Sequence, residues 1–177
     1  CQALFAFLQF YATYKYYCKM QENFITYNPH CWLRFSNDVI FLNSSCLKRH
    51  IKTFELDEKV IEIANDHFEL NKIKNLNLIH HEAFEFVLKT KLNFDLIIID
   101  IFQDTIMPSF LFEAFFQNRL REILNPGGFI LFNTMILKNI DEVRNDNYIR
   151  FFESLQFKIT RLPRLEEHNE LIIVEKI

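Results

Sequence analysis

Glycine is almost absent from this chain. Gly127 and Gly128 are the only two among 177 residues, and they are adjacent, whereas glycine makes up ~7% of an average protein. Only glycine lets backbone N–H groups in a tight turn come close to a bound ligand, so no glycine-rich binding loop exists before residue 127. The usual loop after a first strand is therefore excluded from the N-terminal half.

The chain also lacks an excess of charge of either sign. Its 20 basic and 23 acidic residues leave a formal net charge of -3, which gives no electrostatic footprint for nucleic acid or an anionic membrane. Half of the residues are hydrophobic and 24% are charged, as in one ordinary globular domain. We expect a small-molecule substrate, with no nucleic-acid or membrane partner, and a homodimer is compatible with this interpretation.

The four cysteines have no metal-binding spacing. They are widely separated and form no CxxC pair, so they match neither a zinc site nor a dense disulfide scaffold. Reduced, structural cysteines are typical of the cytoplasm, which is where we expect this protein. The residue types and spacings predict no metal site.

Long hydrophobic runs are missing as well. Residues 3–17 are apolar and aromatic but include Gln9 and Lys15, and they are fewer than the ~20 residues of a membrane span. They lack the basic start and cleavage site of a signal peptide. The chain begins at Cys1 instead of Met, which indicates a fragment. We interpret residues 1–37 as an irregular N-terminal segment and residues 38–177 as one domain.

From residue 51 onward, apolar runs of strand length alternate with segments of helical period. This alternation predicts an α/β fold, a Rossmann-like three-layer sandwich with a mostly parallel sheet and a C-terminal antiparallel pair. The run 94–100 is the clearest strand, because continuous apolarity marks a central strand buried on both faces. The predicted strands are 51–56, 75–79, 94–100 and 129–132, the predicted helices are 58–70, 83–89, 110–124 and 141–155, and the closing pair is 157–162 with 171–174.

Three carboxylates follow the predicted strands. In open α/β sheets ligands bind beyond the carboxyl ends of the strands, and these ends carry Glu55, Glu82 and Asp100. Glu55 is suited to accept both hydroxyls of a ribose, Glu82 with the Ala83 N–H to read the edge of an adenine, and Asp100 to act as a base or to pair with a cation. For Glu55 the alternative interpretation is a solvated charge at the end of the strand. For Asp100 the alternative is a helix-capping role.

Two adjacent histidines and two aromatic stretches have ordinary structural explanations. His80 and His81 are adjacent and point to opposite faces of a strand, so this element cannot place both on one metal; we interpret them as structural. The aromatic stretches 110–116 and 151–152 have helical spacing, which favours a place in the core.

Four segments taken together carry a family resemblance. FELDEKVIEIA at 54–64, EAFEF at 82–86, FDLIIID at 94–100 and LNPGG at 124–128 resemble, in order and spacing, the spermidine synthase-like branch of the class I S-adenosylmethionine-dependent methyltransferases. The resemblance implies a transferase that binds S-adenosylmethionine or its decarboxylated form. It implies cofactor contacts from Glu55, Leu56, Glu82, Ala83, Asp100 and Ile101, and catalytic roles for Asp100 and Asp104.

The resemblance departs from spermidine synthases after Asp100. These enzymes usually follow the strand-ending Asp with two small polar residues and a second Asp, whereas this chain has Ile101, Phe102, Gln103 and Asp104. The adenine position, usually Asp, is Glu82. We therefore rank a methyltransferase of unknown acceptor above a polyamine aminopropyltransferase. An inactive, degenerate scaffold of the same fold is the third alternative.

The first strand and its turn are the weakest part of the match. The nearest candidate strand, residues 38–42, lies eight residues before the strand at Ile51, too few for a crossover of about a dozen. We hypothesise that the N-terminal part is translated in a shifted reading frame, since a one-base shift at residues 27–34 can encode an apolar strand followed by G-x-G. The coding DNA decides this point.

Overall fold

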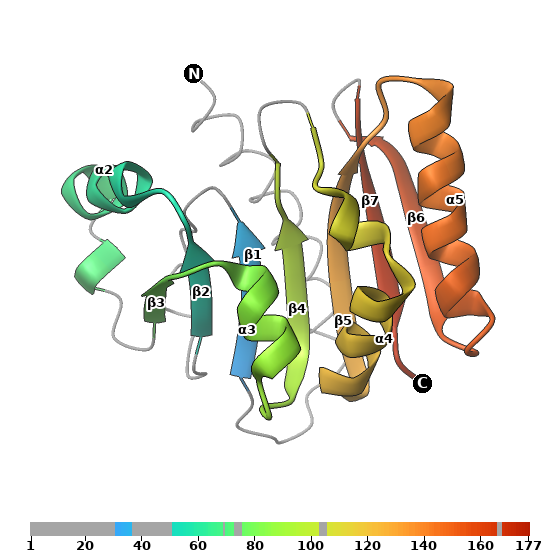
Figure 1. Ribbon diagram of the computed structural model, residues 1–177, viewed down its shortest axis with the longest axis horizontal. Coiled ribbons are helices and arrows are strands. Elements are labelled where there is room, and N and C mark those ends of the chain that lie inside the picture. Colours follow the sequence, from blue (N-terminus) through green and yellow to red (C-terminus); the bar gives the residue numbers. More distant parts are fainter. Residues whose placement is uncertain (1–30, 37–50, 69, 73–75, 103–105, 166–167) are drawn as a thin grey trace.

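The computed structural model describes residues 31–36, 51–68, 70–72, 76–102, 106–165 and 168–177. Within these ranges seven strands form one sheet in the order β3-β2-β1-β4-β5-β7-β6, drawn side by side in Figure 1. Their bounds are β1 Cys31–Ser36, β2 Ile51–Glu55, β3 Leu76–His80, β4 Phe94–Asp100, β5 Leu124–Met135, β6 Lys158–Leu165 and β7 Asn169–Glu175.

Six of the seven described strands run in one direction, and β7 runs in the opposite direction between β5 and β6. The pairs β3/β2, β2/β1, β1/β4 and β4/β5 are parallel, whereas β5/β7 and β7/β6 are antiparallel. Parallel neighbours require crossover connections, and these place helices over the sheet. The predicted Rossmann-like fold, with its C-terminal antiparallel pair, is confirmed.

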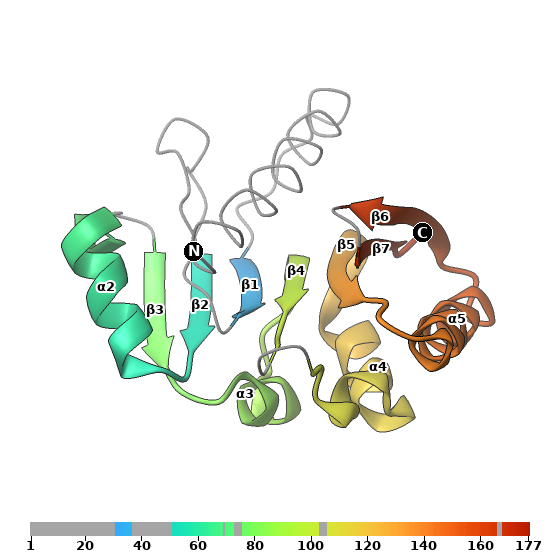
Figure 2. The same ribbon diagram turned by 90° about the horizontal axis from the view of Figure 1, so that it is seen from above.

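The helices cover the sheet unevenly. Seen from above in Figure 2, α3, α4 and α5 lie on one side of the sheet, and α2 lies at the β3 end. None of the helices in the described part of the chain is long and apolar enough to cross a membrane. The α-helices are α2 Glu58–Phe68, α3 Ala83–Lys89, α4 Ala114–Ile123 and α5 Asn139–Glu153, and two short 3-10 helices are η2 Leu70–Lys72 and η3 Ser109–Phe112.

The first strand of the sheet is not where the sequence predicts it. Strand β1, Cys31–Ser36, lies between β2 and β4 and pairs with both in parallel, so it falls inside the segment that we interpret from sequence as irregular. The candidate strand at 38–42 lies outside the described residues. Because β1 ends at Ser36 and β2 begins at Ile51, the connection is longer than the eight residues assumed from sequence, and a parallel crossover is satisfied.

An aromatic core lies between the sheet and the helices on its covered side. Phe116, Phe132 and Phe152 have no exposed surface, and Tyr148 is 1% exposed. The Tyr148 ring centroid is 4.7 Å from that of Phe132 and 5.1 Å from that of Phe152. Aromatic side chains bury large apolar areas and favour tilted contacts of this kind. The core role predicted for the phenylalanine-rich stretches is confirmed there, with Phe115, 51% exposed, as an exception.

The two glycines lie at the entrance to β5. Helix α4 ends at Ile123, and Gly127, with φ +73°, lies four residues beyond it. A Cβ on Gly128 would lie 2.8 Å from the backbone oxygen of Asn125 and 3.0 Å from that of Asp95. Gly127 therefore supplies a left-handed conformation and Gly128 a close backbone approach.

The predicted helix 110–124 is two elements in the structure. Residue Glu113 has extended backbone angles, φ -79° and ψ 136°, and separates η3 from α4. Its carbonyl accepts hydrogen bonds from the N–H groups of Phe116 and Gln117. Glu113 is therefore the N-cap of α4, and the apolar period continues across a break that the pattern alone does not reveal.

A buried polar network joins the C-terminal strands to α5. The Glu170 side chain has no exposed surface; its Oε2 accepts from Asn145 Nδ2 at 3.0 Å, and its Oε1 accepts from Arg161 Nε. Asn145 Nδ2 also lies 2.9 Å from Thr134 Oγ1. Charges buried in this way require partners, so β5, β6, β7 and α5 are held in one arrangement.

Strand β6 is the outer strand of the antiparallel pair. It contains Pro163, and its register with β7 shifts between Leu162 and Leu165. Proline has no backbone N–H to donate, which is tolerated at a sheet edge and not in its interior.

Candidate functional site

The carboxyl ends of β2, β1 and β4 meet along one edge of the sheet, called here the carboxyl edge. Ser36, the last residue of β1, is in register with Asp100, and Phe35 is in register with Phe54, the residue before Glu55. Glu55 and Asp100 therefore flank the end of β1, two strand spacings or about 9.5 Å apart along the sheet. Parallel strands with this register bring together the two carboxylates that the sequence singles out.

Glu55 is fixed by the turn that follows it. Its Oε1 accepts hydrogen bonds from the backbone N–H groups of Leu56 and Asp57, both at 2.8 Å, and the residue is 2% exposed. Asp57 in turn accepts from the Lys59 N–H at 2.9 Å and caps α2. The Glu55 carboxylate is thus held rigidly at the end of β2.

The loop after Glu55 is also tied to the neighbouring strand. The Leu56 side chain is 59% exposed, and its carbonyl accepts from His80 Nε2 at 3.0 Å. His81 Nδ1 lies 3.1 Å from the carbonyl oxygen of Glu82. Each histidine contacts a backbone carbonyl of the loops around the site, which is a structural role. Among the described residues, no group of three or more His, Cys, Asp or Glu is arranged to hold a metal ion.

Glu82 and Ala83 lie at the start of α3, beyond the end of β3. Glu82 is the N-cap residue, but its carboxylate makes no capping hydrogen bond. Glu82 is half-buried and Ala83 is 9% exposed. The first N–H groups of a helix have no partner within it, so the Ala83 N–H is a donor beside an acidic side chain. This is the donor and acceptor pair that an adenine edge requires.

The other end of α3 is anchored by Arg119 of α4. Arg119 Nε donates to the Val87 carbonyl at 3.0 Å, and Nη2 donates to the Thr90 carbonyl. A guanidinium at these last carbonyls satisfies groups that the helix leaves without partners and complements its dipole. The helix that carries Glu82 is therefore fixed relative to the C-terminal half of the fold.

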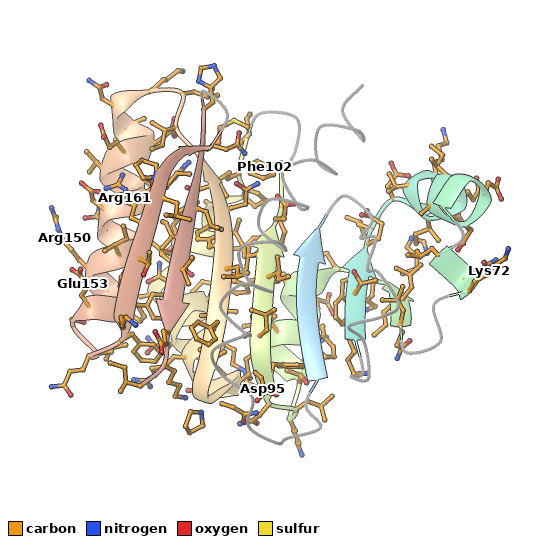
Figure 3. All side chains as sticks on the ribbon, turned by 180° about the vertical axis from the view of Figure 1, so that it is seen from behind. Lys72, Asp95, Phe102, Arg150, Glu153 and Arg161 are labelled. Carbon is orange, nitrogen blue, oxygen red and sulfur yellow. The ribbon has the colours of Figure 1, made fainter. Side chains whose placement is uncertain are left out.

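Asp100 ends the buried strand β4 and is half-buried itself. Its Oδ1 accepts from Asn133 Nδ2 at 2.9 Å, and the next residue, Ile101, is 8% exposed. Figure 3 shows Phe102 beyond the end of β4, while Asp95, near the start of the same strand, lies at the opposite edge of the sheet. Of the two β4 carboxylates, only Asp100 belongs to the carboxyl edge.

Sequence reasoning missed Asn133. It ends the apolar run of β5 much as Asp100 ends that of β4, so inspecting every strand end for amides as well as carboxylates would have found it. Asn169 of β7 donates to Asn133 Oδ1 at 3.2 Å. Asp104, predicted to be catalytic, lies outside the described residues.

Comparison with known proteins identifies the family. Residues 13–168 match the model of the spermine/spermidine synthase domain. The chain belongs to this family. The resemblance drawn from the four sequence segments is therefore confirmed. No curated protein matches the chain.

Solved structures share the fold. Human methyltransferase-like protein 13 in complex with SAH has a TM-score of 0.67 at 16% identity, over 85% of this chain and 73% of that chain. Fibrillarin from Aeropyrum pernix, with natively bound S-adenosyl-L-methionine, has a TM-score of 0.56 at 14% identity, over 82% of this chain and 66% of that one. At such identities the likeness shows the fold alone.

A spermidine synthase is also among these neighbours. The enzyme from Thermotoga maritima has a TM-score of 0.59 at 18% identity, and the match covers 85% of this chain. The match spans 55% of the length of that enzyme. Methyltransferases and a spermidine synthase thus share the architecture that places Glu55, Glu82 and Asp100 on one edge.

The described residues fit the nucleoside part of an S-adenosylmethionine-type cofactor. The carboxyl edge offers acceptors at Glu55, Glu82 and Asp100 and a donor at the Ala83 N–H. The fit is poorer for the methionine end, because no glycine occurs in the chain before residue 127 and β1 is not followed by a glycine turn. The described residues therefore fit the nucleoside part of such a cofactor better than its methionine part.

Proposed function

We propose that this chain binds S-adenosylmethionine (SAM) and transfers its methyl group to a small-molecule acceptor. The observation that supports this most strongly is the position of Glu55 and Asp100 on either side of the end of β1. In open α/β sheets this is the crevice in which nucleosides bind. Membership of the spermine/spermidine synthase domain family supports the same reaction class, transfer from a SAM-type sulfonium.

In this proposal Glu55 binds the ribose. Its Oε1 is engaged by the Leu56 and Asp57 N–H groups, so the carboxylate is held in place before ligand arrives, and Oε2 is the oxygen assigned to the diol. Hydrogen bonds to a charged group contribute ~1.5–3 kcal/mol. Leu56 contributes an exposed side chain beside the ribose, and Glu82 with the Ala83 N–H binds the adenine edge.

Asp100 and Ile101 take the reactive part of the ligand. SAM, when bound, supplies a methyl group on a positively charged sulfur. Asp100 is the carboxylate that attracts this charge and that orients the acceptor or takes a proton from it. Ile101 is 8% exposed and limits water at that point. Alignment of the two reactants alone can contribute ~7–11 kcal/mol to lowering the barrier.

Calorimetry with three ligands tests the proposal. The ligands are SAM, decarboxylated SAM and the demethylated product S-adenosylhomocysteine (SAH). Glu55→Gln is expected to weaken all three by about tenfold, since the ribose is common to them. Asp100→Asn is expected to weaken the two sulfonium ligands by about tenfold and SAH by less than about twofold, because SAH carries no charge on sulfur.

Glu58→Gln is the matched control. Glu58 is an exposed carboxylate in the first turn of α2, three residues after Glu55, and its replacement is expected to leave all three affinities within about twofold. Binding of none of the ligands by the wild-type chain would overturn the enzyme proposal and support the degenerate scaffold. A cytoplasmic location and a homodimer remain predictions from the sequence.

Aminopropyl transfer from decarboxylated SAM to a diamine is the second candidate. It is supported by the family match over residues 13–168 and by the acidic edge, since a diamine requires carboxylates. Mass spectrometry of the product formed from each donor distinguishes the two reactions. If aminopropyl transfer occurs, Asp104→Asn is expected to reduce it by about tenfold or more, whereas an unchanged rate would remove Asp104 from the amine site.

A further inference from the structure

Two asparagines from different strands form a row of hydrogen bonds that ends at Asp100. Asn133 Nδ2 on β5 donates to Asp100 Oδ1 at 2.9 Å, and Asn169 Nδ2 on β7 donates to Asn133 Oδ1 at 3.2 Å. The three strands β4, β5 and β7 are consecutive in the sheet. A line of hydrogen bonds therefore runs across the sheet and ends at the carboxylate of the proposed site.

The order of donors and acceptors along this line fixes the Asn133 amide. A primary amide has one acceptor oxygen and one donor nitrogen. The Asn169 donor holds the Asn133 oxygen on the β7 side, so the nitrogen points at Asp100. A reversed amide would place two oxygens together at Asp100 and two NH₂ groups together at Asn169. Asn169 is 7% exposed, so bulk water competes little for this bond.

Asn169 is itself held in place. The next residue, Glu170, is fully buried and bonded to Asn145 and Arg161. Asn169 is therefore attached to a backbone segment that these bonds hold in place. The His168 carbonyl on its other side accepts from the Ile136 N–H at 2.7 Å. Both neighbours fix the backbone from which the line of hydrogen bonds starts.

We infer that Asn133 is a positioning residue for Asp100 and that Asn169 acts through Asn133. A neutral amide directs the carboxylate without cancelling its charge, whereas a lysine or arginine in the same place would neutralise it. Asp100 then presents a fixed negative charge to a cation. This inference rests on the proposed function for the identity of that cation, the sulfonium of SAM, and it assigns to Asn133 a share in discriminating sulfonium from neutral thioether.

Calorimetry with SAM and SAH tests the effect on discrimination. Asn133→Ala is expected to lower the affinity for SAM by about fivefold to tenfold and that for SAH by less than about twofold. Asn169→Ala is expected to change the SAM-to-SAH ratio in the same direction by about threefold. The double variant is expected to match Asn133→Ala alone, because both residues act through one bond. Equal losses for both ligands, or additive effects of the two changes, would overturn the inference.

Asn125→Ala is the matched control. Asn125 Nδ2 donates to Asp95 Oδ1 at 2.9 Å, the same bond at the same length, but at the opposite end of β4. Removing it is expected to leave the SAM-to-SAH ratio within about 1.5-fold of wild type, since Asp95 is remote from the carboxyl edge. A fall in the ratio as large as that of Asn133→Ala would show a general loss of stability instead of positioning.

Nuclear magnetic resonance of the chain without ligand separates this inference from the proposed function. The side-chain amide signals of Asn133, identified by their loss in Asn133→Ala, are expected to shift in Asp100→Ala and in Asn169→Ala. Signals that stay unmoved in both variants would overturn the inference whether or not a nucleoside binds. Shifted signals, combined with no binding of SAM or SAH by wild type, would overturn the proposed function and leave the line of hydrogen bonds established.

Discussion

The two halves of the sheet are held by different means. In residues 83–177, β4, β5 and β7 bury aromatic and aliphatic side chains against α3, α4 and α5, and the Glu170 network adds buried polar bonds. Among the side chains that the structure describes in 52–66, 70–72 and 76–82, the buried hydrophobic ones are Phe54, Ala64 and Leu70. Helix α2 leaves Ile63 49% exposed.

Glu55 and Leu56, two of the proposed nucleoside contacts, lie in the half with fewer buried hydrophobic side chains. Glu55 and Leu56 belong to β2 and its turn, which are held by strand pairing, by the buried Phe54 and by backbone bonds to side chains. Asp100 belongs to the packed half. Ligand-binding elements are often drawn from the less stable part of a protein. If SAM binds as proposed, it is expected to add most stability to the half that contains Glu55 and Leu56.

Removing the Glu170 side chain is expected to produce the largest effect. Glu170→Ala leaves Arg161 and Asn145 without their shared partner and is expected to lower the free energy of unfolding by ~3–5 kcal/mol, the cost of breaking a buried pair. Urea denaturation measures this. Glu175→Ala, which removes a partner from the more exposed Lys158, is the control and is expected to lower it by less than ~1 kcal/mol. Equal effects would contradict the view that the buried Glu170 network contributes strongly to holding the packed half together.

Ligand is expected to stabilise the less packed half selectively. At a SAM concentration 100-fold above Kd, binding contributes about 2.7 kcal/mol, and amide hydrogen exchange should slow most in β2 and in the turn at Leu56 and Asp57. Strands β5 and β7 are expected to exchange slowly with or without SAM, because their amides open only with the packed half. Slower exchange confined to β5 and β7 would place the ligand elsewhere.

The two glycines give a third test, within the packed half. Gly128→Ala places a Cβ against two backbone oxygens and is expected to lower the free energy of unfolding by up to ~3 kcal/mol. Gly127→Ala meets no atom within 4 Å but must adopt φ +73°, a cost of ~1–2 kcal/mol. Thermal denaturation measures both. Gly127→Asn should recover part of the loss and Gly128→Asn none, since asparagine tolerates only the conformational demand.

Tyr148→Phe is expected to produce the smallest effect, and it is expected to raise the free energy of unfolding instead of lowering it. The Tyr148 hydroxyl is buried and has no hydrogen-bond partner among the described residues, so its removal is expected to stabilise the chain by up to ~1 kcal/mol. Burial raises the pKa of Tyr148 above its ordinary value of 10.0. The folded chain therefore retains a proton that the unfolded chain loses, and stability falls as the pH rises above about 10. Tyr148→Phe should reduce this slope in urea denaturation, and an unchanged slope would contradict it.

The sequence predicts elements in both halves, with β2 and β3 correct to within one residue and a larger error for β5. The bounds predicted for α3 and β4 agree with the structure to the residue, because the continuous apolar run 94–100 and the period of 83–89 match buried elements directly. The break at Glu113 was missed, since a single extended residue interrupts no apolar period. Strand β1 was missed because Arg34 and Ser36 disrupt its apolar pattern and no glycine marks its end.

Some residues of the candidate site can be found from the sequence, and others cannot. Glu55, Glu82 and Asp100 could be found because each follows a predicted strand or opens a helix, and parallel topology brings such positions to one edge. Asn133 and Asn169 meet only because the pairing register of β5 and β7 brings them within reach. Residues 36 apart in sequence carry no local signal of that contact.

Pro163 has a consequence for how copies of this chain could associate. A sheet extends from one molecule to the next when an edge strand presents an unbroken row of N–H and C=O groups to a strand of another chain. On β6 that row is interrupted at Pro163 and skewed by the shift between Leu162 and Leu165. The border formed by β6 therefore discourages strand addition. Any cross-molecular extension of the described sheet is directed to its other border, β3, the neighbour of the strand that carries Glu55.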